Sequence, residues 1–579
     1  MDRILVVNLT RLGDLIQTGP LITGLRARHP GAHLGLLALE SFAAAARLLP
    51  GVDEVLTLDQ DQAVGRLLDS RSPLSARAAW FRGQARRLRG PGWDLVINLS
   101  HSRDSAVLAG LLARGEVRGI RLRPDGRVGV EHDWARYFFC VTGNRAVNHL
   151  NLVDIYRLVG DLGPTEGQVL ALEAGAAAVA RVEELLCELP GPDGVKRPLV
   201  IVQPGASREN RRWPLERLAS FMRRLHAEAG AAFLLSGSAA EEALCASLAE
   251  QCRALPHLNL AGRTSLEELA ALCSRADLLV TNDTGTLHVA AARGLPSVSL
   301  FFATALPWET GPWRPGCFVL QADLECSPCD HQVVCPHVMC RERIPEDSVA
   351  GASLELLRRA GWPVAPPDGW ESRGDARVWE TLRDARGLQD LRLLGRRRPG
   401  ATEIAARIYR RLWLDDLCPA AAGPSEPKVR AFAQELASWL RDWSVPLPET
   451  ATLLAEWRLD LLELARLAGE GPPLVGRVRH EMAQEQPRAA VLEEVVAAIP
   501  ALDDRLFTWE LCHPLLRPLG VFFRFGKEEL RDDDNLECLG AETVLLYERL
   551  VARALMAAEL AGQACALFHH EKQTRVEAA

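Results

Sequence analysis

Hydrophobic positions in the first part of the chain alternate between a strand pattern and a helix pattern. Short runs that are apolar throughout stand at 4–9, 34–39 and 94–99, and stretches with helical spacing lie at 20–28 and 151–161. A strand that is apolar on both faces is buried on both faces, as in a parallel sheet covered by helices. The pattern therefore predicts a doubly wound α/β domain.

The same alternation restarts after a Gly- and Ala-rich segment at 162–180. Helical patterns of this second part lie at 214–229 and 265–276, and the latter begins with Ser265 and Glu268 in the spacing of a capping box. Two such domains would face each other across a cleft, and ligands of open α/β sheets bind at the carboxyl ends of the strands. The predicted strands of the second domain are 198–205, 231–238, 277–283 and 296–302.

Helical spacing dominates after the Pro-rich segment 361–370, and the runs typical of strands nearly vanish. In 427–443 the large apolar side chains fall on one helical face. We interpret this region as a mainly α-helical domain that packs on the rest of the chain or, in an oligomer, on another copy. The alternative is peripheral contact with anionic lipid through the basic stretch 391–413.

The predicted domain limits are 1–170 and 180–360 for two Rossmann-like domains and 371–579 for the helical domain. This division agrees with a length of 579 residues at about 150 residues per domain. A chain that ends near residue 365 is therefore expected to keep both Rossmann-like domains.

Composition and charge narrow the partners and the compartment. The chain is 48% hydrophobic and 25% charged, and its formal net charge of -8 argues against a nucleic-acid partner. The N-terminal apolar run is short, and no stretch approaches the ~18 apolar residues of a membrane span, so we expect a cytoplasmic protein. In a reducing compartment, 14 cysteines do not indicate a disulfide framework.

The first candidate site follows the predicted strand 277–283. A turn, Asp283-Thr284-Gly285, leads into a helix that carries His288. The start of a helix offers unpaired N–H groups and the positive end of the dipole, which together suit phosphate. Asp283 would then cap the helix or accept hydrogen bonds from sugar hydroxyls. The alternative is a capped helix with a histidine in the core.

The second candidate is the loop after the strand at 198–205, where Arg208, Arg211 and Arg212 stand close together. Fixed positive charge at this edge of the sheet would stabilise a departing diphosphate. The alternative is three solvated side chains.

The third candidate is Asp14, which follows the first predicted strand and a turn at Gly13. A carboxylate in this place would face the second domain, as a general base acting on a hydroxyl requires. The alternative is an ordinary helix N-cap.

A fourth feature is a segment with four cysteines within 15 residues. Four thiolates at this spacing suit tetrahedral Zn or Fe, so we interpret them as a structural metal site that clips a long loop. One of the four cysteine ligands can be replaced by His331 or His337. The alternatives to a metal site are free thiols or a disulfide. The four predicted ligands are Cys326, Cys329, Cys335 and Cys340.

Four segments together resemble glycosyltransferase family nine, the ADP-heptose:lipopolysaccharide heptosyltransferases. Over roughly residues 1–360 they occur in the order RLGDLIQTGPLI, QPGASRENRRWP, GSAAEE and TNDTGTLHVAAARGLPSVSLF. The resemblance implies a GT-B fold, with two Rossmann-like domains facing across a cleft. It also implies inverting glycosyl transfer that needs no cofactor for catalysis.

The resemblance further implies roles for single residues. Asp14 falls where the family has the base that deprotonates the acceptor hydroxyl. Arg211 falls where characterised members carry a lysine, so the charge is kept and its geometry changes. Asp283 is expected near the heptose, and the helix start after it near the diphosphate. The expected donor-binding residues are Asp283, Thr284, Gly285, His288 and Arg208, with Glu241 or Glu242 for the ribose.

These observations lead to one interpretation and two alternatives. The interpretation is an inverting heptosyltransferase that moves heptose from ADP-heptose to a saccharide or lipid-linked acceptor of the lipopolysaccharide inner core. It would act in the cytoplasm, with peripheral contact at the inner face of the inner membrane. The first alternative is a protein O-heptosyltransferase of the autotransporter type. The second, a non-catalytic sugar-nucleotide binding or assembly module, is disfavoured by the presence of Asp14, Arg211, Asp283 and His288.

Overall fold

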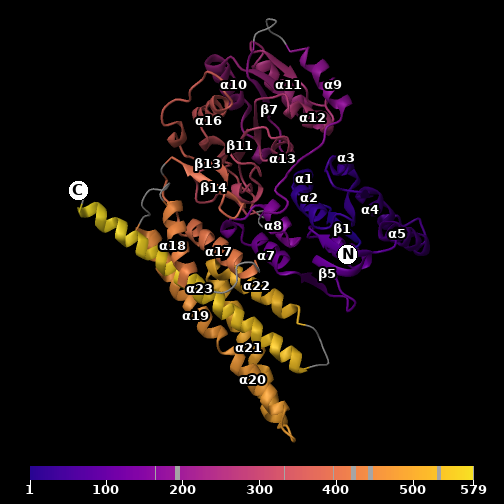
Figure 1. Ribbon diagram of the computed structural model, residues 1–579, viewed down its shortest axis with the longest axis vertical. Helices are drawn as coiled ribbons and strands as arrows, with labels where there is room; N and C mark the ends of the chain where they lie inside the picture. Colours follow the sequence, from indigo (N-terminus) through magenta and orange to yellow (C-terminus); the bar gives the residue numbers. More distant parts are fainter. Residues whose placement is uncertain are drawn as a thin grey trace. The chain divides into compact units, whose positions relative to one another are not determined.

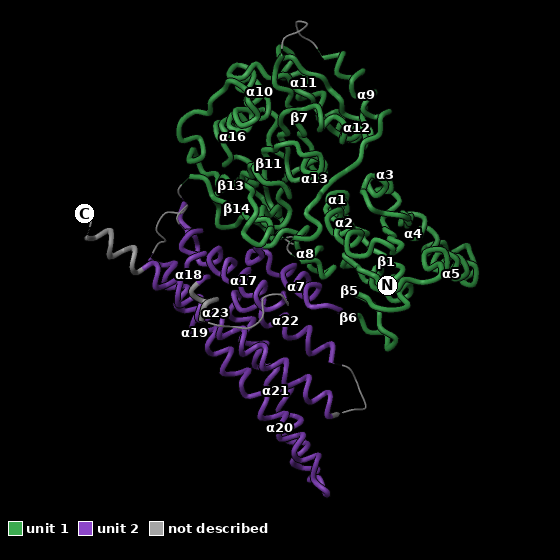
Figure 2. The backbone as a smooth tube through the Cα atoms, in the orientation of Figure 1, with its two compact units in different colours: residues 1–128, 150–396 green, residues 129–149, 397–579 purple. Residues whose placement is uncertain are grey.

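The computed structural model describes residues 1–163, 165–189, 196–330, 333–395, 397–418, 426–440, 448–530 and 536–577. The chain forms two compact units (Figure 1; Figure 2). Unit 1 consists of Met1–Val128 and Leu150–Arg396, and unit 2 of Gly129–His149 and Arg397–Ala579. Each unit is therefore built from two separate stretches of the sequence.

The first sheet has six strands, β1 (Arg3–Asn8), β2 (His33–Leu39), β3 (Glu54–Leu58), β4 (Trp93–Asn98), β5 (Ala113–Leu122) and β6 (Val128–Glu131). Their order is β3-β2-β1-β4-β5-β6, and the pairs from β3 to β5 are parallel. The side chains at 4–7 of the central strand β1 are fully buried, as an apolar strand in a covered sheet must be. The three strands predicted for this domain are confirmed.

The second sheet has eight strands, β7 (Leu199–Gln203), β8 (Ala232–Leu235), β9 (His257–Asn259), β10 (Leu278–Asn282), β11 (Ser297–Phe301), β12 (Phe318–Ala322), β13 (Ala376–Arg383) and β14 (Gln389–Leu394). Their order is β14-β13-β12-β11-β10-β7-β8-β9. The strands from β9 to β12 pair in parallel, and β13 and β14 are antiparallel. The four strands predicted here are also confirmed, so the expected pair of Rossmann-like domains of a GT-B fold is present.

The helices predicted for the two domains are confirmed. They are predicted at 20–28, 151–161, 214–229 and 265–276, and the structure has them as α2 (Gly19–Arg28), α8 (Leu152–Val159), α10 (Leu215–Ala229) and α12 (Leu266–Cys273). The capping box of α12 is formed, because Ser265 N donates to Glu268 Oε2 at 2.7 Å and Glu268 N donates to Ser265 Oγ at 3.2 Å. The helices of unit 1 are α1 (Leu12–Ile16), α2 (Gly19–Arg28), α3 (Ala43–Arg47), α4 (Gln60–Leu68), α5 (Leu74–Arg89), α6 (Arg103–Leu112), α8 (Leu152–Val159), α9 (Ala176–Leu186), α10 (Leu215–Ala229), α11 (Glu242–Gln251), α12 (Leu266–Cys273), α13 (Gly285–Ala292), α14 (Pro307–Thr310), α15 (Cys340–Arg343) and α16 (Glu346–Arg359), with the 3-10 turns η1 (Glu40–Phe42), η3 (Glu209–Arg211), η4 (Ala239–Glu241) and η5 (Trp370–Ser372).

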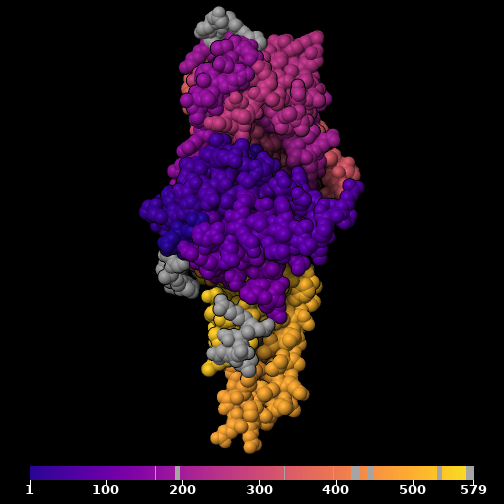
Figure 3. Space-filling view, turned by 90° about the vertical axis from the view of Figure 1, so that its right-hand side faces the viewer, coloured from indigo at the N-terminus to yellow at the C-terminus, as the bar shows by residue number. Residues whose placement is uncertain are grey.

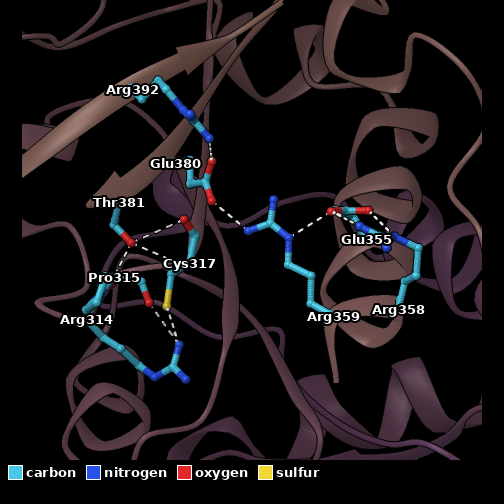
Figure 4. Close-up of polar contacts among 9 residues, drawn as sticks. All are labelled: Arg314, Pro315, Cys317, Glu355, Arg358, Arg359, Glu380, Thr381 and Arg392. Atoms are coloured by element: carbon cyan, nitrogen blue, oxygen red, sulfur yellow. Dashed lines mark hydrogen bonds and ion pairs between the residues drawn. The ribbon is translucent and has the colours of Figure 1, made fainter. Parts of the chain in front are cut away.

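The hairpin β13–β14 differs from the prediction that residues 371–579 are helical. It extends the second sheet past β12 and is tied to α16 by ion pairs (Figure 4). Glu380 lies 2.5 Å from Arg392 and 2.6 Å from Arg359, and Arg359 lies 2.8 Å from Glu355. A strand whose charged side chains are paired within the domain lacks the continuous apolar run by which the other strands are recognised. The hairpin is therefore part of the second domain's sheet.

Unit 2 is mainly α-helical, as predicted for the C-terminal region, but it also contains α7 from within the predicted first domain. Tyr137 of α7 meets Trp413 edge to face at 5.9 Å between ring centres, and Cys140 Sγ donates to the carbonyl of Pro518. An apolar helix face shows that a helix is buried, but it does not show which part of the chain covers it. The elements of unit 2 are α7 (Asp133–Thr142), η2 (Arg145–Val147), α17 (Ala401–Leu417), α18 (Glu426–Leu440), α19 (Pro448–Ala468), α20 (Gly471–Met482), α21 (Ala489–Cys512), η6 (Pro514–Leu516), α22 (Arg517–Glu528) and α23 (Leu536–Glu577).

One described helix segment, Glu537–Phe568 in α23, is long and apolar enough to cross a membrane by length and composition. Charged residues interrupt the apolar positions of this segment, so no continuous apolar run marks it in the sequence. Its buried residues include Tyr547, Ala554 and Ala561, and α23 packs against α19 within unit 2. These contacts are those of a core helix in a helical bundle.

Removal of residues 397–579 is expected to make the remaining chain aggregate. The cut would expose Trp134, Tyr137 and Phe138 of α7, which are buried in unit 2, and exposed apolar patches promote association. Sedimentation of the purified protein measures the effect. The control is the same shortened chain with 129–149 replaced by a Gly-Ser linker, which is expected to be soluble. A soluble, monodisperse protein that still contains 129–149 would contradict this division of the chain.

Candidate active site

The loops after β1, β7 and β10 meet at one place in unit 1. The strand order changes direction between β1 and β4 in the first sheet and between β7 and β10 in the second, and such switch points leave room for a ligand at the carboxyl ends of the strands. Helices α1 and α13, which begin just after β1 and β10, contact each other. The two sheet domains lie against each other in unit 1. In Figure 3 the first domain is indigo to purple and the second is mainly magenta.

Asp14 lies in the first turn of α1 and is partly exposed. Burial raises the pKa of its carboxyl above the ordinary value, and the negative charge of Asp283 acts in the same direction. Hydrogen bonds from the Arg11 backbone and the Thr10 side chain oppose this shift, and Arg11 N donates to Asp14 Oδ2 at 3.4 Å. A carboxylate with a raised pKa is a stronger base, as proton abstraction from a hydroxyl requires.

Asn8 is a buried polar residue next to Asp14 that the sequence patterns did not indicate. The Asn8 side chain donates to Thr18 Oγ1 at 2.9 Å and to the Asp14 carbonyl at 3.1 Å. Tyr156 of α8 hydrogen-bonds to Asn8, and burial and the charge of Asp14 raise the pKa of its hydroxyl. These contacts hold the backbone of α1 in place. The signal in the sequence was a single asparagine at the end of an otherwise apolar strand.

Arg211 and Asp283 form an ion pair, with Arg211 Nη2 3.1 Å from Asp283 Oδ2. Both side chains are 11% exposed, so the pair is largely shielded from solvent, and a bound ligand can still contact it. Asn282 holds the arginine loop against β10, because its side chain donates to the carbonyls of Pro204 and Gly205 at 3.0 Å. The structure thus brings together two candidates that lie far apart in the sequence.

The start of α13 has Thr284 as its N-cap, and the Thr284 side chain makes no capping hydrogen bond. Asp283, the residue before this N-cap, pairs with Arg211 through its Oδ2. At Gly285 an added Cβ would lie 2.9 Å from Leu12 Cδ2, so glycine permits the contact with α1. The Thr284 side chain therefore does not occupy the first N–H groups of α13, which is the arrangement that an anion site uses.

His288 is buried against α1 and is a neutral residue in this structure. Desolvation lowers the pKa of its imidazole to about 4, and its Nδ1 is buried with no hydrogen-bond partner among the described residues. At neutral pH the ring therefore carries no charge that could bind phosphate. Its Cδ2 would lie 2.7 Å from a Cβ added at Gly13, so the ring packs directly on the turn before Asp14.

Gly13→Ala is expected to destabilise unit 1 by about 1–3 kcal/mol, because the added methyl group overpacks against the buried His288 ring. The melting temperature and kcat should fall together, since the turn positions Asp14. Calorimetry and a transfer assay measure both effects. Gly31→Ala is the matched control, because no atom lies within 4 Å of its added Cβ. Equal melting temperatures for the two variants would exclude the tight contact.

The two glutamates expected near the ribose lie in different environments. Glu241 is half-buried, accepts from Ser238 N at 2.8 Å and from Gln203 Nε2 at 3.3 Å, and lies where a side chain at Gly205 would overlap it. Glu242 is exposed at the start of α11. Only Glu241 is thus placed at the carboxyl end of β7.

The remaining arginines of the loop differ from Arg211. Arg208 is exposed and precedes η3, while the Arg212 side chain donates to the carbonyl of Ala206 at 3.0–3.1 Å. Arg212 therefore shapes the loop, whereas the Arg208 side chain is exposed to solvent.

Residues 82–337 match the family model described as glycosyltransferase family 9 (heptosyltransferase). The chain carries a glycosyltransferase family 9 domain, and it is a glycosyltransferase. The matched residues include the arginine loop and the start of α13, whereas Asp14 precedes them.

This glycosyltransferase is similar to curated proteins of bacteria. It is 27% identical to lipopolysaccharide heptosyltransferase 1 of Pseudomonas aeruginosa over 338 residues. This alignment covers 56% of this chain and 86% of that protein. It is 25% identical over 312 residues to lipopolysaccharide heptosyltransferase 3 of Escherichia coli, covering 52% and 83%. Among solved structures, a glycosyl transferase family 9 protein of Veillonella parvula aligns with a TM-score of 0.47 at 22% identity, covering 62% and 97%.

The four cysteines of the glycosyltransferase are not gathered into a metal site within the part of the chain that the structure describes. There, no group of three or more His, Cys, Asp or Glu side chains is placed to hold a metal ion. Cys326 is exposed, and Cys340 is buried on α15. The thiols stay near enough for their charges to add to the burial that raises the pKa of Cys329. His331 lies outside the described residues, and His337 is exposed.

Proposed function

We propose that the protein is an inverting heptosyltransferase that transfers heptose from ADP-heptose to an acceptor of the lipopolysaccharide inner core. The curated relatives, of which the chain covers more than four fifths, are lipopolysaccharide heptosyltransferases and support this substrate class. The main support from the geometry is that Asp14, with its raised pKa, shares one site with the Arg211–Asp283 pair. A base and a fixed positive charge are the two groups that this transfer needs.

In the proposed reaction, Asp14 takes the proton of an acceptor hydroxyl as its oxygen attacks the anomeric carbon. The bond from that carbon to the diphosphate oxygen breaks, and ADP leaves with the bonding electrons. Attack from the side opposite the leaving group inverts the configuration. Arg211 and the first N–H groups of α13 stabilise the charge that develops on the diphosphate.

Two carboxylates would bind the donor without taking part in bond breaking. Asp283 holds Arg211 in place and offers its second oxygen to heptose hydroxyls. We assign the ribose contact to Glu241 rather than Glu242, because Glu241 lies at the carboxyl end of β7. Arg208, Thr284, Gly285 and His288 would complete the donor side, with His288 acting through its packing on Gly13.

The proposed division of labour gives the acceptor to the domain of residues 1–170 and the donor to the domain that begins near residue 180. A lipid-linked acceptor would place the reaction in the cytoplasm, at the inner face of the inner membrane. The helical unit has no role in the chemistry of this proposal.

Incubation of the full-length protein with ADP-heptose and purified inner-core saccharide, followed by mass spectrometry, tests the proposal. The expected product is the core saccharide with one heptose added. The control uses Asp14→Asn, which should form product about 10²- to 10⁴-fold more slowly under the same conditions. Transfer to a polypeptide with none to the core saccharide would replace this proposal by protein O-heptosylation.

A further inference from the structure

Helices α4 and α5, which lie between β3 and β4 in the chain, leave apolar side chains uncovered. The structure describes all residues of both helices, and only Leu88 among them is buried. Leu68 and Leu74 are each 73% exposed, and Leu67 is 60% exposed. Figure 1 shows the two helices on the side of the first sheet domain that faces away from the second. Large apolar side chains that gather on one exposed segment mark a surface on which a partner packs.

The exposed apolar side chains lie close together. Val64, Leu67 and Leu68 are spaced by three and four residues, so they share one face of α4. Leu74 is the first residue of α5 and follows α4 after a short loop. The side chain of Arg77 donates from Nη1 to the Leu67 carbonyl at 2.8 Å, which ties the start of α5 to the end of α4. The four residues therefore form one apolar strip.

The same segment, residues 60–89, is strongly basic. It contains seven arginines and two aspartates, a net charge of +5, whereas the whole chain has a net charge of -8. Arg82, Arg86 and Arg89 are spaced by four and three residues, so they share one exposed face of α5. Within the described part of the chain, the side chains of these three arginines form no hydrogen bond and no ion pair. Their charge is available to a partner outside the protein.

The basic stretch 391–413, which the sequence suggested for contact with lipid, does not offer such a surface. Arg407 and Arg410 in it are 5% and 2% exposed, and Arg392 pairs with Glu380 of the neighbouring strand. Most of its positive charge is therefore used inside the fold.

We propose that α4 and α5 dock the protein on the surface of a bilayer that contains anionic lipids. The apolar strip enters the boundary between headgroups and acyl chains, and Arg82, Arg86 and Arg89 bind the lipid phosphates. A bilayer has an apolar layer directly beneath its phosphates, so it accommodates both kinds of side chain at once. The inference rests on the proposed function for the lipid-linked acceptor that such docking would serve, whereas the surface itself follows from burial and charge.

Sedimentation of the full-length protein with lipid vesicles tests the docking without any donor sugar. The protein is expected to bind vesicles of phosphatidylcholine mixed with phosphatidylglycerol, and to bind phosphatidylcholine alone at least about tenfold more weakly. Arg82→Gln/Arg86→Gln/Arg89→Gln should weaken binding to the anionic vesicles by about 30- to 100-fold, since each arginine near such a surface contributes about fivefold. Leu67→Gln/Leu68→Gln/Leu74→Gln should weaken it at least about tenfold.

The matched control is Arg181→Gln/Arg253→Gln/Arg275→Gln, which removes the same charge from exposed sites of the second domain. It should bind the anionic vesicles within about twofold of the wild type, because these side chains lie outside the proposed surface. Transfer of heptose to a water-soluble core saccharide should be equal in the wild type and in both α4–α5 variants. A wild type that binds vesicles and transfers no heptose would contradict the proposed function and leave the docking surface in place.

Three outcomes of the binding assay would overturn the docking proposal. They are a wild type that does not bind anionic vesicles, an arginine variant that binds them like the control variant, and a leucine variant that binds them like the wild type. The last outcome would leave a surface for a polyanion such as nucleic acid. Slower transfer to the soluble saccharide by the arginine variant would assign the arginines to the acceptor and also overturn the proposal. If the leucine variant does not fold, Leu68→Gln alone decides by the same criterion.

Discussion

Asp14→Asn is expected to lower kcat by about 10²- to 10⁴-fold while leaving the Kd for ADP-heptose nearly unchanged. Asparagine has the size of aspartate and can still accept the hydrogen bond from Arg11 N, but it cannot take the proton of the acceptor hydroxyl. The donor contacts that we propose belong to the loops after β7 and β10, which this change leaves in place. Single-turnover kinetics and donor titration measure the two quantities separately.

The pH dependence gives a second readout of the same residue. Because burial raises the pKa of Asp14, the wild-type kcat should fall on the acid side at a pH above the ordinary pKa of about 3.9 for aspartate. The reason for this sign is that only the deprotonated carboxylate acts as the base. Asp14→Asn should lack this acid limb.

Stability separates a catalytic from a structural role for Asp14. A raised carboxyl pKa means that folding disfavours the charged form, so at neutral pH the charge lowers the stability of the fold. Asp14→Asn removes that charge and should melt at no lower temperature than the wild type. Asp61→Asn, at an exposed site on α4, is the control. Wild-type turnover by Asp14→Asn would leave Asp14 as a helix cap alone.

Arg211→Ala is expected to lower kcat by about 10²- to 10³-fold and to weaken ADP-heptose binding as well. In the proposed reaction the guanidinium meets the diphosphate before and during bond breaking, so its loss is expected to affect both steps. The change also leaves Asp283 without its partner, and this negative charge would then repel the diphosphate. Donor titration and kcat measured on the same preparation test the prediction.

Arg211→Lys serves as the matched variant, since it keeps the charge and loses the planar geometry. It should retain more activity than Arg211→Ala. Arg253→Ala removes an arginine whose side chain is 81% exposed and should change neither quantity. An unaltered donor Kd in Arg211→Ala would show that the positive charge for the diphosphate comes from another group.

Much of unit 1 could be predicted from local patterns, because a central parallel strand that is buried on both faces is a continuous apolar run in the sequence. The runs that became β1, β7 and β10 are apolar on both faces, as their positions in the sheets require. The capping box of Ser265 and Glu268 could also be predicted, since it depends on two residues in one turn of the chain. The hairpin β13–β14 was not, because Glu380 and Arg392 pair with each other and break the apolar pattern.

The sequence by itself determined which chemical groups follow which strand, namely Asp14 after β1, Arg211 after β7 and Asp283 after β10. Only the tertiary structure decided that β7 and β10 are neighbours and that Arg211 and Asp283 form an ion pair. It also decided that α7 packs in the helical unit. The physical reason is that periodicity reports whether a position is buried, whereas its partner depends on packing between segments far apart in the chain.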